Sequence, residues 1–181
     1  MKTKIKTLDM TYIAMFAVII AICSWISVPA EVPFTLQTFA VFLTVGVLGG
    51  RRGTLAVLVY LLLGAVGIPV FAGFVGGMGF ILGNTGGYLV GFIFSALVMW
   101  AMEHLLGKKR WVLALSMVLG LLVLYTFGTV WFMFVFARES GALGLWTALG
   151  WCVFPYIIPD LIKIIFALAI CRQISTVVKF E

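Results

Sequence analysis

Two ionisable side chains, Asp160 and Lys163, stand inside an otherwise apolar stretch that covers residues 140–171. Residues three apart share a helix face, so the carboxylate and the ammonium can pair. At 1.5 Å per residue, they lie about 18 Å and 13 Å before Arg172. At such a depth in a bilayer an ionised group costs at least about 2.5–3.5 kcal/mol. Pro159 suits a helix start, which would put the Asp160 carboxylate at a positive helix end. The pair is either a structural ion pair or, as we favour, part of a functional site.

A glycine-rich stretch over residues 69–91 is the second unusual feature. It reads PVFAGFVGGMGFILGNTGGYLVG, with eight glycines within 19 residues. Irregular backbone at membrane depth is tolerated only where it is buried or lines a cavity. We therefore expect a loop folded over a pocket on the outer side of a membrane, the alternative being close helix packing through small residues.

Other polar and aromatic residues can complete a pocket around this loop. Gln37, at the outer end of a predicted span, carries an amide that donates and accepts, although such a residue can also be merely solvated. The loop itself offers polar Asn84, Thr85 and Tyr88. A small stripe in the first span, Ala14, Ala17 and Ala21, would let another helix approach closely, either from this chain or from a partner.

The elements that must position these residues are membrane helices. The chain has 181 residues, of which 64% are hydrophobic and 10% are charged. A soluble domain is about 45–50% apolar and about 25% charged. Disorder needs low hydrophobicity and high charge, which is the opposite composition. Charged residues divide the chain into stretches long enough for spans over 10–30, 32–50, two within 53–102, 111–137 and 140–171. We predict a single all-α domain over residues 1–181, a bundle of six transmembrane helices. Cleavage of the first stretch as a signal peptide is the less favoured alternative because it is too long.

The positive charges predict the orientation of this bundle. With six spans, ten of the twelve Lys and Arg residues fall on the side that holds both termini, and Arg138 falls on the other side. Positive loops stay in the cytoplasm, so both termini are expected to be cytoplasmic. The net charge of +6 therefore indicates topology and not a nucleic-acid partner.

Enzymatic chemistry is poorly supported by the residue types. The only histidine, His104, lies beside a cytoplasmic cation cluster, and neither G-x-S-x-G nor H-E-x-x-H is present. The three cysteines lie in apolar surroundings without metal-ligand spacing, so we expect no catalytic residue and no metal. A channel would need polar stripes on several helices. An ion-coupled carrier with Asp160 as its relay remains an alternative.

Several stretches together resemble the BioY family, the substrate-binding S components of biotin energy-coupling factor (ECF) transporters. They are PFTLQTFAVFL at 33–43, LGGRRG at 48–53, YLLLGAVGIPVFAGFVGG at 60–77, LGNTGGYLVGF at 82–92 and PDLIK at 159–163. Family members usually carry Pro where this chain has Asn84, and often Ser or Asn where it has Val75.

The resemblance implies a six-helix protein of a prokaryotic cell membrane with an outward-facing biotin site. It further implies a transmembrane coupling subunit (T component) and two ATPase subunits as partners, with ATP used only by them and no cofactor in this chain. Ala14, Ala17 and Ala21 would face the coupling subunit. Another vitamin as ligand is the alternative within the same fold. The residues expected at biotin are Asp160, Lys163, Gln37, Asn84, Thr85, Tyr88, Phe71, Phe74 and Val75.

Overall fold

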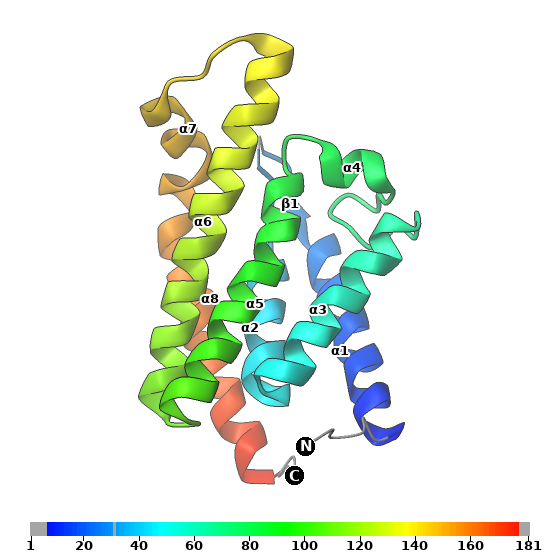
Figure 1. Cartoon of the computed structure of the whole chain (residues 1–181), viewed down its shortest axis with the longest axis vertical. Helices are drawn as coiled ribbons and strands as arrows, with labels where there is room; N and C mark the ends of the chain where they lie inside the picture. The colour runs from blue at the N-terminus through cyan, green and yellow to red at the C-terminus, as the bar shows by residue number, and fades with distance from the viewer. Residues whose placement is uncertain (1–6, 31, 178–181) are drawn as a thin grey trace.

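The computed structural model describes residues 7–30 and 32–177, without the side chains of 139–140 and 175–177. These residues form helices and one two-stranded ribbon (Figure 1). The helices are α1 (Thr7–Trp25), α2 (Gln37–Leu48), α3 (Gly50–Ala65), α4 (Met78–Leu82), α5 (Gly86–Leu106), α6 (Arg110–Ser140), α7 (Leu145–Cys152) and α8 (Phe154–Val177). The strands β1 (Ser27–Val28) and β2 (Phe34–Thr35) pair antiparallel, with Ser27 opposite Thr35.

Four helical stretches of the described part are long and apolar enough to cross a membrane: 7–25, 86–106, 110–138 and 145–174. The α2 and α3 helices have 12 and 16 residues. They are therefore about 18 Å and 24 Å long, against a hydrocarbon core of about 30 Å. The second predicted span, 32–50, was too long as a helix. Residues 34–35 belong instead to the ribbon, and Gly49, with φ of 80°, separates α2 from α3.

The short α2 lies inside the bundle, which explains why it can be short. Nine of its twelve residues are buried, from Gln37 to Leu48. It packs on α8, α3, α1 and α5, while α5 and α6 form the longest pair (Figure 1). A helix that is surrounded by protein need not match the thickness of the lipid.

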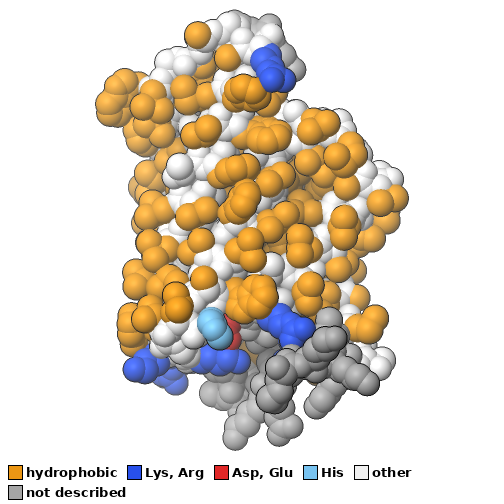
Figure 2. All heavy atoms as spheres, viewed as in Figure 1, with side chains coloured by type: hydrophobic (Ala, Val, Ile, Leu, Met, Phe, Trp, Pro, Cys, Tyr) orange, Lys and Arg blue, Asp and Glu red, His pale blue; other side chains and the backbone are white. Residues whose placement is uncertain are grey.

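Exposed apolar side chains cover the outside of the bundle. Figure 2 shows a broad apolar face, with Lys and Arg side chains gathered at the end where α1 begins and α8 ends. The described cations of this end come from the start of α3, the α5–α6 turn and the last turns of α8. They are Arg51, Arg52, Lys108, Lys109, Arg110 and Arg172. We call this the cationic end. The loop 66–77 and α4 lie toward the opposite end (Figure 1).

Candidate ligand-binding site

A cavity of about 70 Å³ lies between β2 and helices α2, α5, α6 and α8, away from the cationic end. Polar groups and aromatic rings share its wall. The lining residues are Val32, Pro33, Thr35, Gln37, Thr38, Ala72, Phe80, Thr85, Tyr88, Leu89, Phe92, Leu124, Tyr125, Cys152, Tyr156, Asp160 and Lys163. Five of the nine predicted ligand residues are among them: Gln37, Thr85, Tyr88, Asp160 and Lys163. These five residues line one cavity together, but their role at biotin stays a prediction.

The charged pair forms the polar centre of this wall. Asp160 and Lys163 are 3% and 6% exposed, and Lys163 Nζ lies 2.7 Å from Asp160 Oδ1. Tyr125 donates its hydroxyl to Asp160 Oδ2 at 2.6 Å, and Lys163 donates to the Thr35 carbonyl oxygen at 2.7 Å. Both buried charges are therefore compensated by partners from α6 and β2, as buried charges must be.

The helix that carries the pair begins earlier than the sequence suggested. Pro159 lies inside α8, which starts at Phe154, and it is Pro155 that occupies the first turn. The Asp160 carboxylate is thus not at a helix start, and its stabilisation comes from Lys163 and Tyr125. Pro159 has no N–H to offer the carbonyl one turn earlier, which belongs to Pro155.

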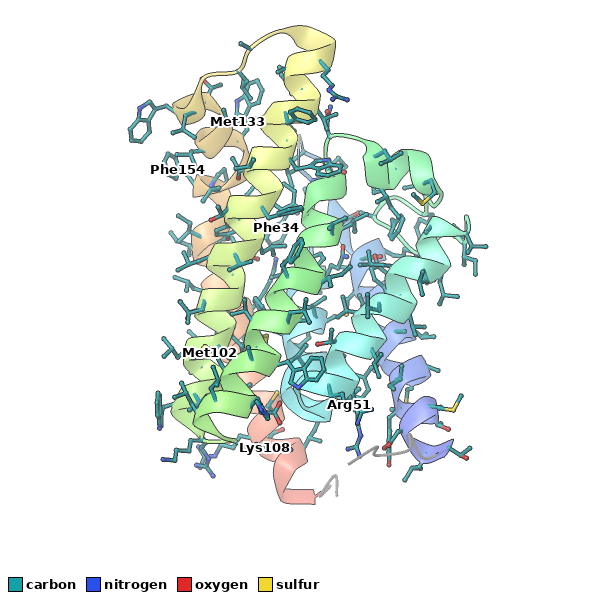
Figure 3. The ribbon with its side chains drawn as sticks, in the orientation of Figure 1. Phe34, Arg51, Met102, Lys108, Met133 and Phe154 are labelled. Atoms are coloured by element: carbon teal, nitrogen blue, oxygen red, sulfur yellow. The ribbon has the colours of Figure 1, made fainter. Side chains whose placement is uncertain are left out.

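Aromatic rings hold Lys163 from the ribbon side. Its ammonium lies 4.0 Å from the centre of the Phe34 ring, which is labelled in Figure 3. The Phe34 ring in turn stacks on Tyr156, with the centroids 6.2 Å apart. Tyr156 donates its hydroxyl to the Val32 carbonyl oxygen. These contacts fix the short ribbon over α8, and they fix with it the Thr35 carbonyl oxygen, which accepts the hydrogen bond from Lys163.

Gln37 brings an unused donor to the cavity. The residue is 4% exposed, and its backbone N–H donates to Thr35 Oγ1 at 3.1 Å. Its side-chain Nε2 is buried and has no hydrogen-bond partner among the described residues. A buried, unmade hydrogen bond costs about 1–3 kcal/mol, so this amide is a candidate donor to a ligand in the cavity.

The α4–α5 region supplies Thr85 and Tyr88 but not Asn84. Tyr88, in the first turn of α5, shares a hydrogen bond of 3.1 Å with Thr129 Oγ1 on α6. Asn84 does not line the cavity, although its Oδ1 is buried and has no partner within the described part of the chain. Asn84 is therefore next in sequence to a lining residue, Thr85, but does not line the cavity itself, and its predicted role at biotin stays a prediction.

The glycine-rich loop lies over the cavity and contributes two side chains to its wall, while the role of Phe71, Phe74 and Val75 at biotin stays a prediction. It reaches the wall through Ala72 and Phe80, whereas Phe71, Phe74 and Val75 do not line the wall. Phe71 is fully buried and stacks behind Phe80, with centroids 5.5 Å apart. Its place is thus behind the wall because Gly64 leaves room for its ring: a Cβ there would lie 2.0 Å from Phe71 Cζ.

The other two predicted ligand residues of the loop, Phe74 and Val75, are exposed. Phe74 is 63% exposed and stacks on Trp25 of α1, with centroids 5.0 Å apart. Val75 is 38% exposed and accepts a backbone hydrogen bond from Phe71. Trp25 donates to the Pro69 carbonyl oxygen at 2.9 Å. The loop is therefore anchored to the end of α1.

The small stripe on α1 is divided between the inside and the outside of the chain. Ala17 and Ala21 are 1% and 5% exposed and belong to the core, where α1 packs on α2 and α3. Internal helices thus cover Ala17 and Ala21 in this chain, and their role toward a coupling subunit stays a prediction. Ala14 is exposed, and its role at an interface stays a prediction.

Tyr125, Thr35, Phe34 and Tyr156 were not foreseen as site residues. Of these four, Tyr125 could have been identified from the sequence, since a phenol within an apolar span needs a partner for its hydroxyl. The Thr35 contribution is a backbone carbonyl, which no residue type reveals.

Fold and site together define a class: a helical membrane protein with a small polar cavity, built around a buried ion pair and placed beneath a loop. The BioY family model matches residues 1–180. The biotin transporter BioY of Thermotoga maritima is 42% identical over 162 residues, which cover 89% of this chain and 92% of that protein. Biotin transporter BioY2 of Lactococcus lactis is 37% identical over 177 residues, covering 97% and 96%.

The fold agrees with these sequence matches. A crystal structure of the S-component for biotin from an ECF-type ABC transporter superposes with a TM-score of 0.86 at 26% identity, covering 100% of this chain and 97% of that chain. The chain belongs to the BioY family.

Proposed function

We propose that this protein is the biotin-binding S component of an ECF-type vitamin uptake transporter. It captures biotin on the outer side of a prokaryotic cell membrane, as a bundle of six transmembrane helices with both termini in the cytoplasm. A transmembrane T component and two ATPase subunits drive import. The chain itself is not an enzyme and carries no cofactor. The names of its relatives and the cation asymmetry between the two ends support this proposal.

The observation that carries the proposal is the grouping of Gln37 Nε2 with the Asp160–Lys163 pair in one cavity. The ureido ring of biotin presents two N–H donors and one carbonyl acceptor. Asp160 offers carboxylate oxygens to the donors, while Gln37 Nε2 offers a donor that has no partner among the described residues. The remaining wall is mostly apolar, as the bicycle of biotin requires.

Binding exchanges partners at the ion pair. In this structure, Asp160 accepts from Lys163 and Tyr125. A ureido N–H that reaches Asp160 takes over one of these bonds, and Lys163 then serves the ureido carbonyl or the biotin carboxylate. The Thr35 carbonyl keeps the ammonium in place during this exchange. Neither charge is left without a partner in either state, which a buried site requires.

Ligand entry requires the loop to move. The cavity has about 70 Å³, whereas pockets for small molecules are commonly about 300–1,000 Å³. Ala72 and Phe80 bring the loop to the wall, so outward movement of residues 66–82 enlarges the cavity toward the outer side. The anchors of this loop at Trp25 are hydrogen-bonded and stacked contacts that can break and re-form.

Equilibrium binding of labelled biotin to the purified chain in detergent tests this function. We expect saturable binding that thiamine and riboflavin do not displace. Asp160→Asn should weaken it at least about tenfold, or ~1.4 kcal/mol. Asp9→Asn is the matched control because Asp9 pairs with Arg52 at 3.0 Å at the cationic end. Equal affinity of Asp160→Asn and wild type, both folded and monodisperse, would remove Asp160 from the site.

A second measurement separates the S component from an autonomous carrier. Proteoliposomes that hold only this chain should bind biotin without accumulating it under an ion gradient. Accumulation by the chain alone would favour the ion-coupled alternative, with Asp160 as relay. Binding of another vitamin in place of biotin would retain the fold and change the ligand.

A further inference from the structure

A second and larger cavity lies at the cationic end of the bundle. It has about 540 Å³ and is bounded by α2, α5, α6 and α8. Because α5 packs mainly on α6 and α2 mainly on α8, the space lies at the seam between these two pairs. It shares no lining residue with the cavity around Asp160. The proposed biotin site therefore does not account for it.

The polar part of this second cavity is strongly cationic. Lys108, Lys109, Arg110 and Arg172 line it, against a single carboxylate of the described lining, that of Glu103. Glu103 is already engaged, since it lies 3.2 Å from Lys108 Nζ and accepts from the Gly50 N–H. Lys109 and Arg110 thus add positive charge to the lining beyond the Lys108–Glu103 pair, which suits an anionic group.

The deeper part of the same cavity is apolar. Its wall includes Val45, Met99, Leu113 and Leu168. On α6 the lining runs from Arg110 to Ser116, which corresponds to about 9 Å along the helix axis. A phosphate or another small anion would fill only the cationic part. An occupant that uses the whole cavity needs a charged head and an apolar tail.

We propose that this cavity is a binding site for one anionic phospholipid of the membrane leaflet at the cationic end. The lipid phosphate contacts Lys109, Arg110 and Arg172, and an acyl chain enters between α2 and α6. The position of the site fits such a ligand, because the cations mark the edge of the apolar belt in Figure 2, where headgroups lie. Basic pockets between membrane helices at this level are suited to acidic headgroups.

Native mass spectrometry of the full delipidated chain in detergent tests the site, with phosphatidylglycerol and phosphatidylcholine of identical acyl chains as probes. We expect phosphatidylglycerol to bind at least about tenfold tighter. Arg110→Gln should weaken it about fivefold, the worth of one cation near a membrane surface. Arg51→Gln is the matched control, because Arg51 lies at the same end but outside the cavity (Figure 3). It should change the affinity less than twofold.

A cavity-filling variant tests the apolar half. Ala114 lines the cavity and is half-buried. Ala114→Phe should weaken phosphatidylglycerol at least about fivefold without removing a charge. Inorganic phosphate should not displace the lipid.

Three results would overturn the proposal. They are equal binding of the two lipids, equal effects of Arg110→Gln and Arg51→Gln, and an Ala114→Phe variant with unchanged lipid affinity. If Ala114→Phe left the lipid affinity unchanged and inorganic phosphate displaced the lipid, the cavity would be a site for small anions and not for a lipid. Size-exclusion profiles and melting temperatures of all variants separate loss of the site from loss of the fold.

Discussion

Removing one partner of the Asp160–Lys163 pair should destabilise the protein at least as much as removing both. Asp160→Asn leaves the Lys163 ammonium with its contacts to the Thr35 carbonyl and the Phe34 ring. Lys163→Met leaves the Asp160 carboxylate with the Tyr125 hydroxyl. Breaking a buried pair from one side costs about 3–5 kcal/mol, because an uncompensated charge stays behind.

The double variant Asp160→Asn/Lys163→Met has no charge to leave behind. We therefore expect it to cost no more than either single variant, which corresponds to a coupling energy of about 3 kcal/mol. The assay is unfolding in mixed dodecyl maltoside and SDS micelles, followed by tryptophan fluorescence without biotin. It compares free energies of unfolding for wild type, both single variants and the double variant.

A second ion pair of the same chain provides the control cycle. Asp9 and Arg52 lie 3.0 Å apart, and their side chains are 15% and 24% exposed. Partly solvated pairs contribute about 0–1 kcal/mol, so Asp9→Asn and Arg52→Met should each cost little and combine nearly additively. If the Asp160–Lys163 cycle were additive within about 0.5 kcal/mol, the claim that its charges are desolvated would be refuted.

Three further variants test the wall and the loop. Tyr125→Phe removes the donor to Asp160, so isothermal titration should show a biotin Kd raised about ten- to a hundredfold, and an unchanged Kd would contradict this role. Gln37→Leu should weaken biotin about tenfold while leaving the free energy of unfolding without biotin unchanged or higher, since it removes a buried N–H group that has no partner among the described residues. Ser24→Ala removes the 2.6 Å bond to the Val70 carbonyl, so stopped-flow measurements should show faster biotin dissociation, about fivefold. Slower release would mean that this bond opposes closure of the loop.

The sequence could predict the features that depend on charge. Asp160 and Lys163 were found because an ionised pair is rare in an apolar span, and the folded chain buries both. The cation asymmetry was likewise predictable, since Arg51 and Lys108 lie at one end (Figure 3). Gln37 stood out as an amide beside a span, and the structure places it in the cavity.

Features that depend on backbone geometry were beyond the sequence. Phe71 and Phe74 are the same residue type in the same loop, yet one is fully buried and the other 63% exposed. The difference follows from the turn between them, where Gly73 and Phe74 both have positive φ. The length of α2 was misjudged for a related reason, because an interior helix and a spanning helix are equally apolar.

The register of α2 against α8 links packing to the site. Lys163 donates to the Thr35 carbonyl, and Cys171 Sγ donates to the Leu43 carbonyl at 3.9 Å. Both contacts join residues 128 positions apart, so the segment from Thr35 of β2 to Leu43 of α2 runs alongside α8 in the same direction.

Close approach at one end of this helix pair secures the polar contact at the other. A Cβ at Gly46 would lie 2.6 Å from Cys171 Sγ and 3.2 Å from Met117 Cε, so glycine lets α2 lie this near to α8 without displacing these side chains. Sliding α2 by one residue, about 1.5 Å, would take the Thr35 carbonyl out of hydrogen-bond range of Lys163. The buried ammonium would then lose its backbone partner at the cost described above. The apolar contact at Gly46 is therefore part of what positions the charged site.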